Sequence, residues 1–176
     1  VYEVCYTEYM KQPIMPFILG ESTYEGEHDE HGSAVQVRKQ AYWTMLSGGA
    51  GHSYGSPFWA VESSQVRGND WRKRLDMEGA NTLKYLNKLL TLFDWTSLQP
   101  QFPSTPQKGY AKNDFATSAL TADKKTLVSY IPSYRVMNYD LMQLSGNKIT
   151  AKEFNPRTGE IKVLSTITKN KRVQRF

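Results

Sequence analysis

Glu21 is the residue in this sequence that is best placed to carry out chemistry. It follows a short apolar run, residues 14–19, with only Gly20 between them. In a (β/α)8 barrel, the residues that directly follow the strands build the active site. A carboxyl group in that place can be the acid, the base or the nucleophile of glycoside hydrolysis, which needs two such groups. Glu21 is therefore a candidate catalytic carboxylate; alternatively, it only caps the strand end or pairs with an arginine.

Further polar and aromatic side chains occur where they could join Glu21 in a sugar-binding cleft. Tyr24 and Glu25 follow it closely, and His52 and Tyr54 mark the end of the next predicted strand, with Trp59 just beyond. Aromatic faces and a few well-placed polar groups are typical of ligand pockets. His52 could also orient Glu21 from the neighbouring strand. For Tyr54 and Trp59, packing at the rim of a barrel explains the residue types equally well.

The loop 25–31 is rich in carboxylates and also holds His28 and His31. Carboxylate and imidazole together suit several divalent metal ions. The four residues His-Asp-Glu-His are contiguous and lack helical ligand spacing, which favours a solvated acidic loop. The sequence has no glycine-rich phosphate loop, zinc-ligand spacing or Ser/His/Asp arrangement. We therefore expect neither a metal nor a cofactor.

The elements that must position these residues have the order of a βαβ unit. The apolar run 14–19 fits a parallel strand that is buried on both faces. Ser33 is a plausible N-cap for a helix that ends at Ser47-Gly48-Gly49. A second strand with its exit loop follows over residues 52–61, and residues 79–93 form the clearest amphipathic helix. A shorter helix is expected over residues 1–10.

The residue pattern of the sequence changes near residue 100. Pro100, Pro103 and Pro106 are incompatible with a helix interior or a central strand, so residues 98–108 are predicted to be a domain boundary. Short strand-like runs separated by turns then suggest an antiparallel sandwich. They cover residues 115–120, 126–131, 148–154 and 160–167. The predicted domains are 1–99 and 100–176.

Charge and cysteine content narrow the classes of function. Residues 1–100 carry nine Lys/Arg and twelve Asp/Glu, whereas residues 101–176 carry thirteen and five. The basic residues of the second part are spread along the predicted strands without an aromatic-rich nucleic-acid motif, so a nucleic-acid partner is not expected. No apolar stretch approaches the ~20 residues of a membrane span, which argues against a membrane partner. Cys5 has no second cysteine to pair with.

Four motifs, taken in order, make the sequence resemble a known family. They are GESTYEG at 20–26, RKQAYW at 38–43, GGAGHSYG at 48–55 and FNPRTG at 154–159. Together they resemble the apiosidase-like glycoside hydrolases of bacteria, in which a (β/α)8 barrel is followed by a β-sandwich named as collagen-binding. The sequence departs from the family at Ser22, where a proline usually follows the Gly-Glu pair.

The resemblance implies a fold and a set of roles. Residues 1–99 would be the C-terminal part of a (β/α)8 TIM barrel, and residues 100–176 a small antiparallel β-sandwich lacking its last strand. Glu21, after the seventh barrel strand, would be the nucleophile, with Glu25, His52 and Tyr54 lining its pocket. The second carboxylate would come from an upstream strand, so this segment alone is expected to be inactive without the N-terminal half of the barrel. The substrate would be a polysaccharide side chain, and the protein would be exported.

Two rival functions stay open at this point. The second domain could be a non-catalytic carbohydrate- or collagen-binding module, with Tyr130, Tyr134 and Tyr139 as an aromatic platform. A metal-dependent hydrolase that uses the His28/His31 loop is the weaker alternative. It predicts that a chelator abolishes activity.

Overall fold

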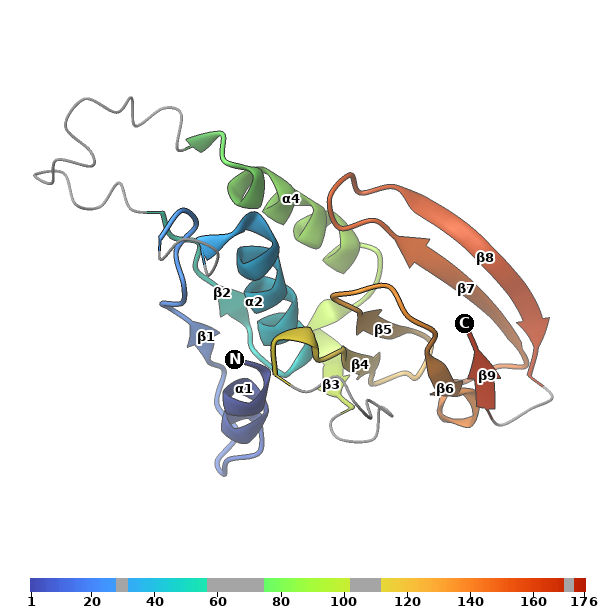
Figure 1. The fold of residues 1–176 in the computed structure, drawn as a ribbon. Helices are drawn as coiled ribbons and strands as arrows, with labels where there is room; N and C mark the ends of the chain where they lie inside the picture. Colours follow the sequence, from blue (N-terminus) through green and yellow to red (C-terminus); the bar gives the residue numbers. More distant parts are fainter. Residues whose placement is uncertain (28–31, 57–74, 102–111, 170–172) are drawn as a thin grey trace, which may run out of the picture.

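The structure, a computed structural model, describes residues 1–27, 32–56, 75–101, 112–169 and 173–176 (Figure 1). Trp59, His28, His31, Pro103 and Pro106 lie outside these ranges. The described helices are α1 (Tyr2–Tyr9), α2 (Ala34–Leu46) and α4 (Glu78–Leu90). The strands are β1 (Ile18–Leu19), β2 (Gly51–His52), β3 (Leu98–Pro100), β4 (Thr117–Thr121), β5 (Leu127–Tyr130), β6 (Asn138–Asp140), β7 (Lys148–Phe154), β8 (Ile161–Thr168) and β9 (Val173–Arg175).

The predicted βαβ unit is present, with β1 and β2 parallel and α2 between them in the chain. Ile18 is opposite Gly51 and Leu19 is opposite His52. Backbone hydrogen bonds extend this alignment on both sides, from Ala50 N to Phe17 O (2.8 Å) and from Ser53 N to Leu19 O (2.9 Å). The residues after β1 and the residues after β2 therefore leave the pair at the same edge.

In the described residues the 14–19 run is not buried on both faces, as expected for two barrel strands without the rest of the barrel. Ile14, Met15 and Ile18 are 68%, 69% and 65% exposed. Within the described residues β1 has one strand neighbour, β2. The outer edge of β1 and the side chains before it are consequently left uncovered.

Helix α2 lies at the centre of the molecule, and its predicted ends are confirmed. The Ser33 side chain caps its N-terminus by accepting a hydrogen bond from Gln36 N at 3.3 Å. Its C-terminus stops before Gly48, whose positive φ of 99° favours glycine. The ring of Tyr9 also lies where a Cβ of residue 48 would be. Almost every side chain from Val37 to Leu46 is buried, which makes α2 a rigid support for the loops around it.

The second part of the chain is antiparallel, as predicted. It contains a three-stranded sheet, β3-β4-β5, and the two-stranded pairs β6-β9 and β7-β8. Four of these strands fall close to the predicted runs, whereas β6, β9 and β3 were not predicted. Pro100 lies in β3, which is an edge strand and so tolerates a residue without an N–H donor. β3 lies at the start of the predicted boundary and pairs with β4, which follows it.

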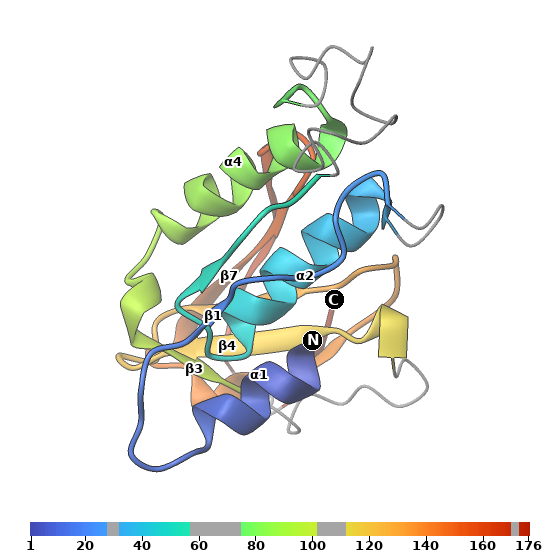
Figure 2. The same cartoon turned by 90° about the vertical axis from the view of Figure 1, so that its left-hand side faces the viewer.

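One hydrophobic core runs through both parts of the chain. Tyr42 of α2 stacks on Tyr130 of β5 with ring centroids 4.5 Å apart. Trp43 donates from Nε1 to the carbonyl of Phe115 at 2.8 Å, and Phe115 also stacks on Tyr2 of α1. Figure 2 shows α2 lying over β4 with α1 and α4 on either side. A smaller second core forms around Leu120, Leu141 and Leu144. Among the described residues, no helix is long and apolar enough to cross a membrane.

Candidate active site

Glu21 follows the end of β1, and its side chain is exposed. The hydroxyl of Tyr24 donates to Glu21 Oε1 at 3.0 Å. This hydrogen bond is the main cause that raises the pKa of Tyr24, so the phenol stays protonated and remains a donor. The Tyr24 ring lies against Gly55, where an added Cβ would collide with it. The exit loops of β1 and β2 thereby place a solvent-accessible carboxylate with a fixed hydrogen-bond donor beside it.

Gln40, on the buried face of α2, holds the two residues that follow Glu21. In the amide orientation that satisfies both ends of its side chain, Gln40 donates to Ser22 Oγ at 2.9 Å and to Thr23 O at 3.2 Å. It also accepts from Thr23 N at 3.2 Å. Buried polar groups are expected to be satisfied in this way. This role of Gln40 could not be predicted from the sequence, because no local pattern shows that Gln40 faces this loop.

His52 stands next to this network, on the strand beside Glu21. Its Nε2 lies 3.5 Å from Ser22 Oγ, and its backbone pairs with Leu19. Burial lowers the pKa of the imidazole below its ordinary value of 6.5. The ring is therefore neutral at pH 7, able to donate from one nitrogen and to accept at the other. No hydrogen bond between His52 and Glu21 is present in the described structure.

The His52 shift gives a prediction for stability. Because the folded pKa lies below the unfolded one, the stabilisation is complete above about pH 6.5 and decreases as the pH falls through the folded pKa. We expect the free energy of unfolding to drop over this window in the wild-type protein, and to drop less in His52→Asn. Urea unfolding of both proteins at a series of pH values measures this. The prediction would be wrong if the free energies of unfolding of the wild type and of His52→Asn changed equally with pH.

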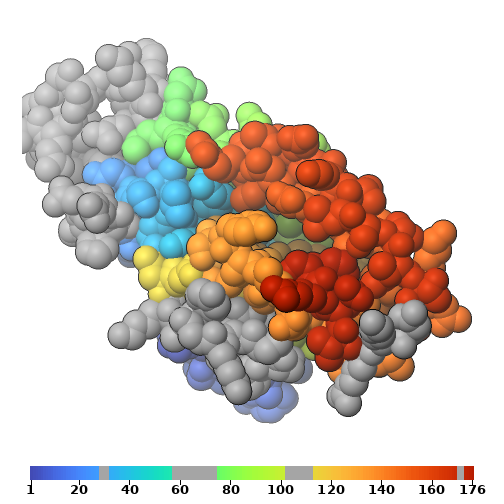
Figure 3. Space-filling model, turned by 45° about the vertical axis from the view of Figure 1, so that its right-hand side comes forward, coloured from blue at the N-terminus to red at the C-terminus, as the bar shows by residue number. Residues whose placement is uncertain are grey.

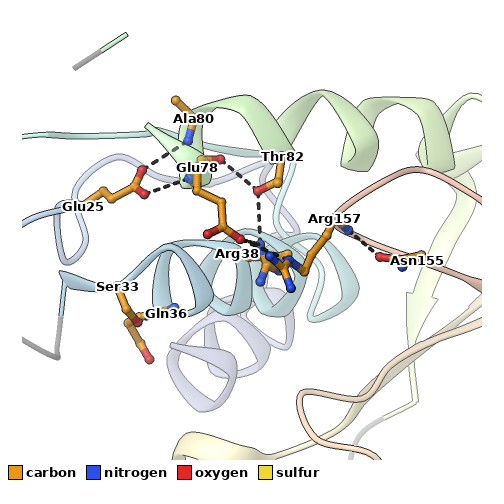
Figure 4. Close-up of polar contacts among 10 residues, drawn as sticks. Glu25, Ser33, Gln36, Arg38, Glu78, Ala80, Thr82, Asn155 and Arg157 are labelled. Carbon is orange, nitrogen blue, oxygen red and sulfur yellow. Dashed lines mark hydrogen bonds and ion pairs between the residues drawn. The ribbon is translucent and has the colours of Figure 1, made fainter. Parts of the chain in front are cut away.

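Glu25, which was predicted to bind substrate, is buried and fully engaged within the protein (Figure 4). Its carboxylate accepts from Tyr54 Oη at 2.8 Å, from Gly79 N at 2.8 Å and from Ala80 N at 3.2 Å. The amides of Gly79 and Ala80 belong to the first turn of α4, whose N–H groups have no acceptor within the helix. A negative charge is favourable at this end of a helix. Met77, the N-cap of α4, supplies no side-chain cap, so Glu25 takes over that function. Glu25 and Tyr54 are thus brought together, with the Glu25 carboxylate buried and Tyr54 partly exposed.

The close approach of Glu25 to α4 also explains a glycine. A Cβ on Gly79 would collide with both carboxylate oxygens of Glu25. The first turn of α4 therefore admits the carboxylate only because residue 79 has no side chain. The sequence contained no signal of this contact, since Glu25 and Gly79 are 54 positions apart.

The structure describes only part of the residues on which the two rival functions rest. There, no three His, Cys, Asp or Glu side chains gather in a way that could hold a metal ion; His28 and His31 themselves lie outside these residues. Of the three tyrosines of the predicted aromatic platform, Tyr130 is buried in the core, and burial raises the pKa of Tyr139. Tyr134 alone is fully exposed.

Two family models match separate parts of the chain. The family model "Apiosidase-like, catalytic domain" matches residues 1–97. A second model, "Putative collagen-binding domain of a collagenase", matches residues 108–176. No curated protein matches the chain.

Two solved structures resemble the chain over 99% of its length. One is a glycoside hydrolase, with a TM-score of 0.83 and 25% sequence identity. The other is a glycoside hydrolase family 5 protein from Bacteroides vulgatus, with a TM-score of 0.82 and 24% identity. The chain spans 41% of the length of each of these proteins.

Proposed function

The chain belongs to the apiosidase-like catalytic-domain family over residues 1–97, and we propose that the protein is a glycoside hydrolase with Glu21 as one of two catalytic carboxylates. The observation that carries this proposal is the position of Glu21. Its carboxylate is exposed where β1 ends, beside the end of the parallel strand β2, and Tyr24 holds it at 3.0 Å. In parallel α/β barrels that edge is where active sites form.

We propose further that β1, α2, β2 and α4 are the last two βα units of a (β/α)8 barrel. The parallel pairing of β1 and β2 and the central place of α2 support this. The exposed apolar residues Ile14, Met15 and Ile18 fit a surface on which further barrel strands pack. The second carboxylate would then come from a strand outside these 176 residues. This fits the 41% coverage of the solved relatives.

In the proposed reaction, the Glu21 carboxylate attacks the anomeric carbon of the sugar. The second carboxylic acid protonates the leaving oxygen as the glycosidic bond breaks, and water then hydrolyses the glycosyl ester with that residue acting as base. Tyr24 donates to Oε1 of Glu21, so the carboxylate is oriented before substrate arrives. Gln40 fixes the backbone directly after Glu21. The Glu25 carboxylate stabilises the loop that follows Glu21, because it bonds to Tyr54 and to the first turn of α4.

The proposed substrate is a glycan, in the class of polysaccharide or oligosaccharide side chains. The names of the two solved relatives and of the family model support a glycan substrate, and the side-chain class stays a prediction. Contacts of the sugar with His52 and with Trp59, which lies outside the described residues, stay predictions. Export of the protein also stays a prediction.

Trapping with a mechanism-based inhibitor tests the proposal. The full-length protein is incubated with 2-deoxy-2-fluoro aryl glycosides, which form the glycosyl ester but hydrolyse it slowly. We expect one equivalent of aryl alcohol to be released, together with a mass adduct on the peptide that contains Glu21. Turnover of ordinary aryl glycosides with an adduct on another carboxylate would remove Glu21 as nucleophile. Failure to hydrolyse any aryl glycoside or oligosaccharide of a broad panel would refute the hydrolase assignment.

A further inference from the structure

The turn between β7 and β8 reaches back to the helix that holds Glu25. Arg157 in this turn donates from Nε to Glu78 Oε1 at 3.1 Å, and Glu78 is the first residue of α4. The same Glu78 oxygen lies 3.8 Å from Nη1 of the buried Arg38 on α2. The backbone N–H groups of the next two residues, Gly79 and Ala80, donate hydrogen bonds to the Glu25 carboxylate (Figure 4). The turn is thus linked to the Glu25 carboxylate through three consecutive residues of one helix.

A second contact lies farther along the same helix. Lys88 donates from Nζ to the carbonyl of Gly159 at 2.7 Å. Gly159 is buried, and a Cβ added to it would lie 2.5 Å from Cδ1 of Tyr85. Glu78, Tyr85 and Lys88 follow one another at spacings of seven and three, which places them along one face of a helix. The space-filling view shows the tip of the β7-β8 hairpin packed against α4 (Figure 3).

Hydrogen bonds within the turn itself fix its conformation. Asn155 accepts from Gly159 N through its carbonyl at 2.8 Å and from Arg157 N through Oδ1 at 2.9 Å. Gly159 has a φ of +69°, a conformation that costs a residue with a Cβ. Since Arg157 and Glu78 are both exposed, their ion pair adds little stability. The glycine and its close packing on Tyr85 are the stronger constraint.

From these contacts we propose that the β7-β8 turn is a brace that fixes the first turn of α4 against Glu25. The second domain is then an integral support of the site and not a separately tethered binding module. Arg157 and Gly159 act as positioning residues. The link to catalysis rests on the glycosidase function proposed above, whereas the brace itself concerns only the geometry of α4.

Two glycines in the second domain provide a matched pair for the test. Gly159 and Gly146 both have positive φ, +69° and +75°, so an alanine is strained at either position. A Cβ at Gly146 meets nothing within 4 Å, whereas a Cβ at Gly159 meets Tyr85 and Lys88 of α4. Gly159→Ala therefore disturbs the brace and the turn, and Gly146→Ala disturbs only its own turn.

Hydrogen exchange in the full-length protein measures the effect without any substrate. In Gly159→Ala, we expect the amides of Gly79 and Ala80 to exchange about tenfold faster, while amides of α2 stay protected. In Gly146→Ala, both should stay as in the wild type. Unchanged exchange at Gly79 and Ala80 in a folded Gly159→Ala protein would overturn the brace. So would an equal rise in both variants.

Should Gly159→Ala fail to fold, the double variant Arg157→Met/Lys88→Met replaces it as the test, since it removes both of the hydrogen bonds described above between the turn and α4. It should raise exchange at the same two amides by a smaller factor, and no rise would overturn the brace. On a glycan that the wild-type protein hydrolyses, Gly159→Ala should lower kcat about tenfold relative to Gly146→Ala, with a smaller change in KM. If Glu21→Gln keeps full activity, the proposed function fails while the exchange result still decides the brace.

Discussion

Glu21→Gln is expected to lower kcat of the full-length protein by about 10³-fold or more, while glycan binding is retained. The substitution keeps the size and shape of the side chain but removes the charge and the nucleophilic oxygen. Tyr24 can still donate to the amide oxygen, so the exit loop of β1 should keep its conformation. Steady-state kinetics on the substrate that the wild type hydrolyses best give kcat and KM, and calorimetry with the same glycan gives its affinity.

Glu153→Gln is the control, because Glu153 is also an exposed glutamate but lies on β7 in the second domain. Its kcat should equal that of the wild type. A Glu21→Gln protein with wild-type kcat would eliminate Glu21 as a catalytic group. Loss of activity accompanied by loss of glycan binding would instead give Glu21 a role in holding the substrate. The two readouts together therefore separate catalysis from recognition.

The features that sequence reasoning predicted well are those with local causes. The helix from Ser33 to Ser47 has a capping side chain at one end and a pair of glycines at the other, and both act on their immediate neighbours. The position of Glu21 after a parallel strand follows from the apolar run that precedes it. The strands β7 and β8 follow from alternating residues on either side of a turn with Pro156 and Gly159.

The role of Glu25 could not be predicted, because its partners are distant in sequence. Its motif places it four residues after Glu21, which led to the prediction that it lines the same pocket. In the structure the chain turns at Gly26, whose φ is +86°, and Glu25 points inward to Tyr54 and to the first turn of α4. Only the folded chain shows that α4 begins without a cap of its own and that Gly79 leaves room for a carboxylate.

The packing across the predicted boundary could not be predicted for a related reason. The prolines near residue 100 indicate a break in regular structure, but they say nothing about packing across it. Tyr42 stacks on Tyr130, 88 positions later, and Trp43 donates to the backbone of Phe115. These contacts join α2 to the antiparallel sheet in one core. A composition shift can mark a change of architecture without marking a boundary between independent units.

The buried position of Glu25 leads to the second large prediction, which concerns stability. Glu25→Ala removes the carboxylate that accepts from the amides of Gly79 and Ala80 and from the Tyr54 hydroxyl, and with it the negative charge at the N-terminus of α4. Unsatisfied buried donors are costly, so we expect the free energy of unfolding to fall by about 3 kcal/mol. Urea unfolding of the full-length variant and wild type at pH 7 measures the difference.

Glu153→Ala, at an exposed position, should change the free energy of unfolding by less than about 0.5 kcal/mol. Gly79→Ala offers an independent test of the same contact, since its methyl group must displace the Glu25 carboxylate. Its effect should be non-additive with Glu25→Ala, because the collision disappears once the carboxylate is gone. If Glu25→Ala were as stable as the wild type but failed to bind glycan, Glu25 would be a substrate ligand, as the motif suggested. A large loss of stability with this coupling makes it the anchor that joins the Glu21 loop to α4.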